Sequence, residues 1–189
     1  GGVVRDIDAS QMAEIVSVLD GIKGEYTQIM NTLLTDTSVK NRTVGVGHIT
    51  TEDAAALSMV GPFARASNLP YDVRSFGRGA YGDLADFAPI TATEGDCYAR
   101  VKVRCLEVLQ SIEIIKELGA KIPAGDIEVA VKGAPADGAQ ASNVLEQPRG
   151  ECYYYARGNG SKNLERMRMR TPTSQNLAGM TTALAGCDL

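Results

Sequence analysis

The sequence has no tryptophan, a single histidine and four cysteines, none of which forms a C-x-x-C pair. Zinc cages and Ser-His-Asp triads need the residues that are scarce here, so both are weak candidates. The cysteines also lack the compact spacing of a disulfide framework, which favours a reducing compartment. We expect each cysteine to be a packing residue rather than a metal ligand.

Long apolar runs and an excess of positive charge are missing as well. No apolar run approaches the roughly 20 residues of a membrane-spanning helix, and no secretory signal opens the sequence. Nineteen Lys and Arg stand against 23 Asp and Glu, for a net charge of -4, which argues against nucleic acid as a partner. With 44% hydrophobic residues, the chain is expected to fold around an ordinary core.

Two long helices are predicted from apolar residues that recur at steps of three and four. The first runs from Asp8 to about Thr35, with Asp8 or Ser10 as its N-cap, and Gly21 and Gly24 predict a bend, a break or a close contact inside it. The second follows a Thr93-x-x-Asp96 capping-box pattern and ends at Gly119. It is apolar over so much of its circumference that we expect it to be the core helix.

Shorter elements are predicted between these helices. Residues 44–49 are expected to be extended, and Thr50 with Asp53 predicts a short helix through about Met59 that Gly61 and Pro62 end. Residues 68–89 contain Pro, Gly and scattered aromatic residues. They are expected to form an irregular connection packed on the core.

The C-terminal third predicts a small antiparallel sheet. Residues 127–131 alternate between apolar and polar, two further strand patterns cover 144–157 and 164–170, and Gly158-Asn159-Gly160 is a hairpin signal. In the last strand three arginines share one face and two methionines share the other, so one face should meet water or an anion. A final helix is expected at about 174–184.

The predicted fold class is therefore α+β, mainly helical, with a long core helix and a small antiparallel sheet in the C-terminal half. We expect one fragment domain over 1–189, with a helical part (1–122), a small β part (123–173) and a truncated C-terminal helix (174–189).

Arg149 is the best candidate for chemistry from residue types alone. It lies between Pro148 and Gly150 in a loop that could aim its guanidinium into a pocket. Pairing of Arg149 with Glu146 or Glu151 at the surface is the favoured alternative at this point.

Two other positions are weaker candidates. Thr173 is either a hydroxyl beside Pro172 for a small anionic ligand or a helix N-cap, and the single His48 receives no role.

Four segments together resemble one superfamily, and they occur in its order. They are V-G-P-F-A-R-A-S at 60–67, D-V-R at 72–74, E-G-D-C-Y-A-R at 94–100 and Q-P-R-G-E at 147–151. The chain resembles the large subunit of membrane-bound, energy-converting [NiFe] hydrogenases, which share ancestry with the 49-kDa-type quinone-module subunit of respiratory complex I. The fragment would thus be an excised part of a larger hydrogenase large-subunit fold.

Details at both ends favour the hydrogenase branch. R-M-R-T-P-T at 168–173 with Asn176 is similar to its R-x-R-T-P-T motif, G-C-D-L at 186–189 resembles the approach to its last metal-binding segment, and residues 1–7 resemble its G-G-V-R-R-D-I. Asn68, Val4 and Gly79-Ala80 depart from the family pattern. The middle loop is therefore expected to differ locally.

The resemblance implies that two C-x-x-C motifs, which bind nickel and iron, lie outside this segment. The fragment alone should be inactive and without stoichiometric nickel. Its parent would interconvert protons and H2 at a Ni-Fe centre. Electrons would come from an iron-sulfur small subunit, and membrane subunits would translocate ions. The expected location is cytoplasmic, peripheral to the inner face of the cell membrane.

The resemblance also assigns roles to four residues. Arg149 matches the catalytic arginine that overhangs the metal site, and Pro148 shapes its loop. Thr173 matches a residue that holds a diatomic ligand, and Pro172 lines the same wall. Arg65, Arg74 and Arg104 are left as structural or interfacial.

Two other functions stay open. One is a quinone-side subunit of an NADH:quinone oxidoreductase, and the other is a non-catalytic scaffold subunit. Flanking cysteine pairs would indicate the hydrogenase, a quinone-pocket Tyr and His upstream would indicate the quinone-side protein, and the absence of both would indicate the scaffold. Because a fragment leaves apolar helix faces uncovered, we also expect self-association.

Overall fold

The computed structural model describes residues 2–187, so Gly1 of the first motif and Asp188 and Leu189 of the last lie outside the described residues. The elements in chain order are α1 (Ala9–Thr35), α2 (Thr37–Thr43), α3 (Thr51–Ala56), α4 (Gly61–Arg65), η1 (Val73–Phe76), η2 (Gly79–Asp83), α5 (Cys97–Gly119), β1 (Gln140–Gln147), β2 (Gly150–Gly158), β3 (Leu164–Arg170), α6 (Pro172–Gln175) and α7 (Leu177–Leu184). The fold is α+β with a small antiparallel sheet, as predicted.

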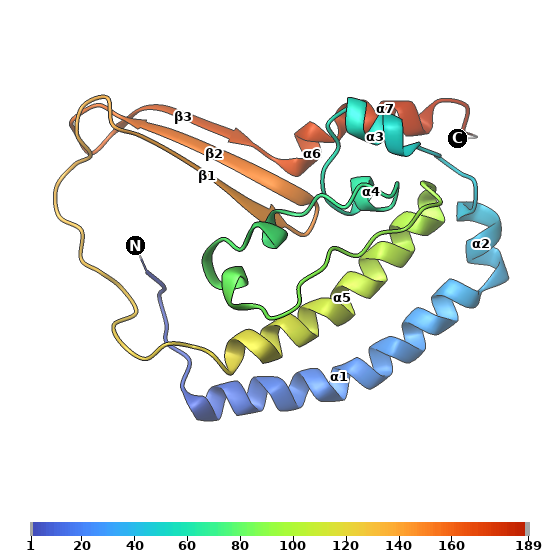
Figure 1. Ribbon diagram of the computed structural model, residues 1–189, viewed down its shortest axis with the longest axis horizontal. Helices are drawn as coiled ribbons and strands as arrows, with labels where there is room; N and C mark the ends of the chain where they lie inside the picture. Colours follow the sequence, from blue (N-terminus) through green and yellow to red (C-terminus); the bar gives the residue numbers. More distant parts are fainter. Residues whose placement is uncertain (1, 188–189) are drawn as a thin grey trace.

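The two long helices lie side by side along one edge of the molecule, and the sheet extends along the other (Figure 1). Tyr side chains join α1 and α5 at two points. The Tyr26 hydroxyl donates to the Cys105 carbonyl at 3.1 Å, and that of Tyr98 donates to the Leu34 carbonyl at 2.7 Å. The short helices gather where α5 and the sheet converge, which places α4 between them.

Asp8 is the N-cap of helix α1, as predicted: its carboxylate accepts from Gln11 N while the Gln11 side chain accepts from Asp8 N. The helix continues without interruption through Gly21 and Gly24, and a Cβ at either would meet nothing within 4 Å. The predicted break and the predicted close contact are therefore wrong. Both glycines face solvent, so they cost helix propensity without serving a contact.

Two expectations around the short helices are also wrong. Residues 44–47 form turns rather than a strand, because Gly45 and Gly47 take positive φ angles of 72° and 60° and Asp96 Oδ2 accepts from Gly45 N at 2.7 Å. Gly61 and Pro62 begin α4 instead of ending α3, which stops at Ala56. A proline is tolerated there because the first turn of a helix has no intrahelical acceptors for its N–H groups.

The cap of α5 and the cap of α6 each lie away from the predicted residue. Asp96, not Thr93, caps α5 by accepting from Ala99 N at 2.8 Å, and Gly95 before it has a φ of 65° that keeps it outside the helix. Thr171 rather than Thr173 caps α6. The N-cap alternative for Thr173 is thus wrong.

The alternating residues 127–131 do not form a strand. Val129 and Val131 are 73% and 81% exposed, and the one bridge in this stretch of the described chain joins Glu128 to Gly2. Alternation alone cannot make a strand without a neighbouring strand to supply hydrogen bonds.

The sheet has the order β1-β2-β3, and both pairs are antiparallel. Arg168 stands opposite Tyr155 and Met169 opposite Tyr154, so the arginines and the methionines lie on different faces as predicted. Met167 and Met169 are 50% and 63% exposed. In this chain the methionine face of β3 is therefore exposed to solvent, like its arginine face.

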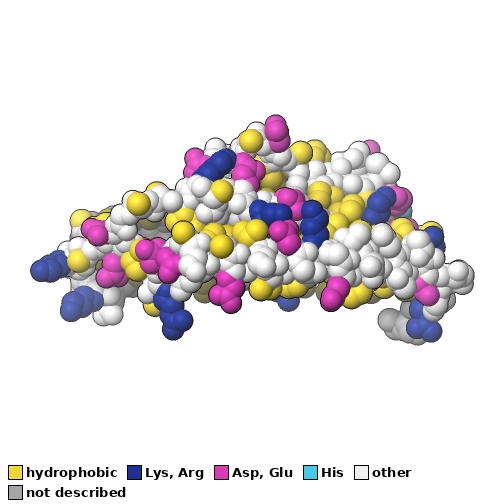
Figure 2. Space-filling model, turned by 90° about the horizontal axis from the view of Figure 1, so that it is seen from below, with side chains coloured by type: hydrophobic (Ala, Val, Ile, Leu, Met, Phe, Trp, Pro, Cys, Tyr) yellow, Lys and Arg dark blue, Asp and Glu magenta, His cyan; other side chains and the backbone are white. Residues whose placement is uncertain are grey.

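The core surrounds α4 and combines several alanines with a few larger apolar residues. One cluster contains Ile49, Ala54, Met59, Ala64 and Ala183, and the other contains Ala66, Ala92, Ala99 and Val103. Helix α1 contributes little to either, since Met30 is its one buried residue. Figure 2, which views the molecule from the α1 side, shows apolar side chains exposed between charged ones.

Candidate functional site

A two-residue connection, Pro148-Arg149, joins β1 to β2, and the paired residues Gln147 and Gly150 close it. We call residues 147–150 the Arg149 turn. The ring of Pro148 fixes its φ, while Gly150 takes a φ of 127° that other residues rarely adopt. The sequence thus makes a tight turn with the Arg149 side chain on its exposed tip.

The surface pairing of Arg149 with Glu146 or Glu151 is wrong. Glu146 Oε1 accepts from Arg65 Nη1 at 2.9 Å, and Glu151 is bound by Arg170 and by the Tyr71 hydroxyl. Both carboxylates therefore point into the protein. Among the described residues, no carboxylate pairs with Arg149.

The Arg149 turn rests directly on the backbone at the start of α4. A Cβ at Gly61 would lie 2.3 Å from the Arg149 carbonyl oxygen, and one at Gly150 would lie 2.7 Å from Gly61 N. Because neither glycine has a Cβ, the backbone of α4 and the backbone of the turn approach more closely than any side chain would permit. The backbone of the Arg149 turn is therefore held in place although its side chain is exposed.

The segment with Pro172 and Thr173 is brought to the same place by Asn176. Its amide accepts from Val60 N at 2.9 Å and donates to the Val60 carbonyl at 3.0 Å, next to Gly61. Pro172 is buried at the first turn of α6, whereas Thr173 is exposed. The structure thus brings the Arg149 turn and Asn176, four residues after Pro172, to Val60-Gly61. The roles assigned to the four predicted site residues stay predictions.

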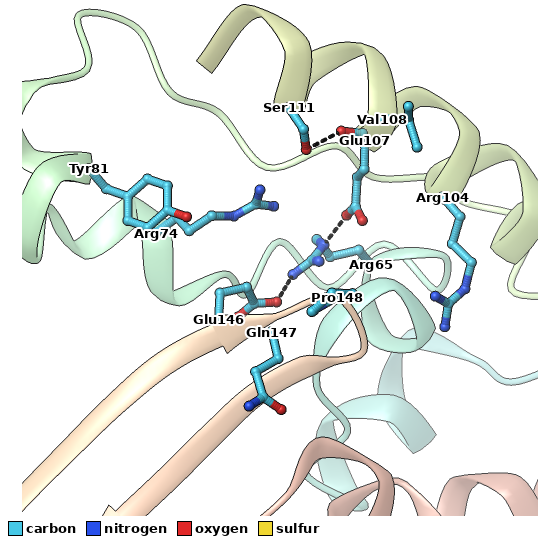
Figure 3. Close-up of a pocket in the computed structure, with 10 residues that line it drawn as sticks. All are labelled: Arg65, Arg74, Tyr81, Arg104, Glu107, Val108, Ser111, Glu146, Gln147 and Pro148. Atoms are coloured by element: carbon cyan, nitrogen blue, oxygen red, sulfur yellow. Dashed lines mark hydrogen bonds and ion pairs between the residues drawn. The ribbon is translucent and has the colours of Figure 1, made fainter. Parts of the chain in front are cut away.

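A buried ion cluster lies between the base of the turn and α5 (Figure 3). Arg65 is 1% exposed; its Nε donates to Glu107 Oε1 at 2.7 Å, and its Nη1 donates to Glu146 as described. Asp72, fully buried, lies 3.1 Å from Arg65 Nη1 and is also paired with Arg74. The structural role expected of Arg65 and Arg74 fits this placement.

The cluster lines a cavity of about 350 Å³. Its walls are Arg65, Arg74, Tyr81, Arg104, Glu107, Val108, Ser111, Glu146, Gln147 and Pro148. Burial raises the pKa of Glu146, and the charge of Arg65 offsets part of this effect. The base of the Arg149 turn therefore lies beside a polar cavity lined by arginine and glutamate side chains.

A second polar group, Tyr71-Glu151-Arg170, lines another cavity of about 540 Å³. Burial, and then the hydrogen bond and charge of Glu151, raise the pKa of Tyr71 to about 12. Reasoning from the sequence missed this group. Its signal was the presence of Tyr71 beside D-V-R and of Glu151 within Q-P-R-G-E, two of the segments that carry the resemblance.

The described residues do not supply a metal site. Within 2–187, no group of three or more His, Cys, Asp or Glu side chains could hold an ion. Cys152 is 1% exposed within β2, and Cys97 Sγ accepts from Arg100 Nη2 at 3.2 Å. A Ni-Fe centre therefore does not fit the donor set of this segment, and its thiolates would have to come from elsewhere.

Comparison with known proteins identifies the family. Residues 1–138 match the family described as respiratory-chain NADH dehydrogenase, 49 Kd subunit. The chain belongs to this family. The predicted kinship with the complex I 49-kDa subunit and the energy-converting hydrogenase large subunits is thereby confirmed.

The relatives of this chain include a hydrogenase as well as subunits of NADH-quinone oxidoreductases. The chain is 33% identical to the carbon monoxide-induced hydrogenase of Rhodospirillum rubrum, and the alignment covers 98% of this chain and 52% of the relative. It is 32% identical to a subunit of the F(420)H(2) dehydrogenase of Methanosarcina mazei, with the same coverage. A subunit of the NADH-quinone oxidoreductase of Herpetosiphon aurantiacus is also 32% identical. The chain spans about half the length of these relatives.

A solved structure agrees with the fold. A chain of the membrane-bound sulfane sulfur reductase, an archaeal respiratory membrane complex, aligns with a TM-score of 0.83 at 24% identity, over 99% of this chain and 57% of that one. The chain therefore shares its fold with a segment of that protein. None of the helices in residues 2–187 is long and apolar enough to cross a membrane.

Proposed function

We propose that this chain is the central segment of the large subunit of an energy-converting [NiFe] hydrogenase, with Arg149 as its catalytic residue. The observation that carries the proposal is the Arg149 turn. It has a fixed backbone, and its guanidinium has no carboxylate partner among the described residues. Such a guanidinium keeps its donors available for a ligand. R-M-R-T-P-T at 168–173 and the hydrogenase from R. rubrum support this branch.

The four site residues would form one wall. Arg149 would present N–H donors from a turn that Pro148 and Gly150 fix. Pro172 is buried at the start of α6, and Thr173 next to it is exposed. The metal centre, bound by cysteines outside this segment, would supply the reversible conversion of protons and electrons into H2. The isolated segment is expected to be inactive because it lacks those cysteines.

The parent complex would place this large subunit at the membrane without inserting it. We propose an iron-sulfur small subunit as electron donor and membrane subunits that translocate ions, with the large subunit peripheral on the cytoplasmic side. The structural neighbour is part of a respiratory membrane complex, which supports this arrangement.

A quinone-side subunit of an NADH:quinone oxidoreductase is the second candidate. It is favoured by the NADH-quinone oxidoreductase relatives, whose 31% and 32% identities nearly equal that of the hydrogenase. A non-catalytic scaffold subunit is the third. In either case Arg149 would serve the structure or an interface.

The first experiment is to sequence the parent gene upstream of residue 1 and downstream of residue 189. Two C-x-x-C pairs would support the hydrogenase, and the absence of both would contradict it. The second experiment introduces Arg149→Lys into the parent complex, with Arg166→Lys on exposed β3 as the matched control. We expect Arg149→Lys to lower H2 evolution at least tenfold and the control to leave it unchanged, because lysine cannot present the planar guanidinium fork.

A further inference from the structure

Helix α4 contacts the end of the β1-β2 hairpin at both of its ends. At its first residue, Gly61 touches the backbone of Arg149 and Gly150 with no space for a Cβ. At its last residue, Arg65 reaches Glu146 Oε1 at 2.9 Å, three positions before Arg149. Gly61 and Arg65 lie one helical turn apart, so a single rigid turn of helix supports the end of the β1-β2 hairpin.

Arg65 also fixes α4 to the rest of the protein. Its Nε donates to Glu107 on α5 at 2.7 Å, and its Nη1 donates to the Tyr71 carbonyl at 3.0 Å. A guanidinium can do this because its donors point in several directions within one plane, whereas a lysine ammonium has no such fork. Arg65 thus links Glu146 on β1 to Glu107 on helix α5.

The burial of this pair is not explained by stability alone. The side chains of Arg65 and Glu146 are 1% and 4% exposed, so both have lost their hydration. Replacing a buried ion pair with apolar residues often leaves stability unchanged or improved, and the best-attested benefit of such pairs is a fixed geometry. The geometry fixed here is that of β1 immediately before the Arg149 turn.

We propose that Arg65 and Glu146 are positioning residues whose ion pair holds the Arg149 turn in one orientation on α4. The inference rests on the proposed function for the use that is made of Arg149. The orientation itself is a property of this chain and is measured without any reaction.

The test is a distance measurement by pulsed electron resonance. Nitroxide labels are attached through an encoded keto amino acid at position 149 and at exposed position 28 on α1, so that the native cysteines are kept. The width of the distance distribution is compared among the unsubstituted chain, Glu146→Ala, Glu146→Gln and Glu107→Ala. Glu107→Ala is the matched control, since it removes another bond of Arg65 but lies on α5 rather than on β1.

We expect Glu146→Ala to widen the distribution about twofold, and Glu146→Gln to keep most of the narrow distribution because an amide oxygen still accepts from Arg65. Glu107→Ala should leave the width unchanged, because Arg65 keeps its bonds to Glu146 and to the Tyr71 carbonyl. An unchanged width in Glu146→Ala would overturn the proposal, and so would equal widening in Glu107→Ala. If Glu146→Ala does not fold, Arg65→Lys replaces it with the same expected widening. Failure of Arg149→Lys to affect H2 evolution would count against the proposed function alone.

Discussion

Glu146 and Glu151 stand directly opposite each other across the β1-β2 ladder, yet each carboxylate is bound to a different arginine. Like charges in opposed positions destabilise a sheet. Here Arg65 on α4 neutralises Glu146 and Arg170 on β3 neutralises Glu151, so the hairpin end is stable only with α4 and β3 in place. The turn that carries Arg149 is therefore assembled from three parts of the chain.

The Tyr71-Glu151 contact predicts late titration of one tyrosine. Because the folded pKa of Tyr71 is about 12 and the ordinary value is 10.0, its contribution to stability is full below pH 10 and is lost as the pH rises through 12. Phenolate absorbance should show Glu151→Gln lowering the pKa of Tyr71 only in part, since burial is the larger cause. Burial also raises the pKa of Tyr26 to about 12, so the titration is repeated in a Tyr26→Phe background, where Tyr26 no longer contributes to the absorbance change. An unchanged titration in Glu151→Gln would refute the contact.

Two glycine substitutions should have opposite effects on stability. Gly61→Ala places a methyl group against the Arg149 carbonyl at a φ of 72° and should lower the free energy of unfolding by about 3 kcal/mol. Gly21→Ala fills open space in α1 and should raise it by about 0.5–1 kcal/mol. Urea denaturation measures both. A neutral Gly61→Ala would show that the turn and α4 are not in close contact.

The outer face of α1 should drive self-association of this segment. Val18, Ile22, Ile29 and Leu33 are 37–65% exposed along one side of the helix. Ile29→Glu should weaken association about tenfold in sedimentation at tens of micromolar, a loss of about 1.4 kcal/mol. Val131→Glu, at an 81% exposed loop position, is the control and should have no effect. A monomeric unsubstituted chain would contradict the prediction.

Purified segment should contain no stoichiometric nickel, because its cysteines are not grouped with other ligands among the described residues. Elemental analysis by mass spectrometry is the measurement. Cys187→Ser should leave the metal content unchanged. About one nickel per chain that is lost in Cys187→Ser would reverse our assignment of the ligands to segments outside 1–189.

Local signals were enough to predict much of the fold. Helices α1 and α5 combine long apolar periodicity with clear ends, and the hairpins combine Pro, Gly and Asn at their turns. Residues 127–131 show the limit of such signals. Their alternation was a local pattern, and only the tertiary structure reveals that no strand lies beside them.

The candidate site was predictable only in part for the same reason. The exposed tip of the turn follows from Pro148 and Gly150, which are adjacent to Arg149. The partners of Arg65 lie 42 and 81 residues away, at Glu107 and Glu146, so no sequence window contains the cluster. Proximity in sequence instead suggested that Glu146 pairs with Arg149, which the structure contradicts.

The exposed connection between α5 and β1 has a practical consequence for engineering. Residues 123–137 lie almost entirely at the surface, and no helix or strand of the fold passes through them. This connection forms a bridge from Glu128 to Gly2 and packs Pro135 against Gly158, and both contacts lie away from the place where α4 meets the hairpin. An affinity tag or a reporter domain inserted there should leave the buried ion cluster around Arg65 undisturbed. By contrast, a single methyl group added at Gly61 should disturb the junction between α4 and the hairpin.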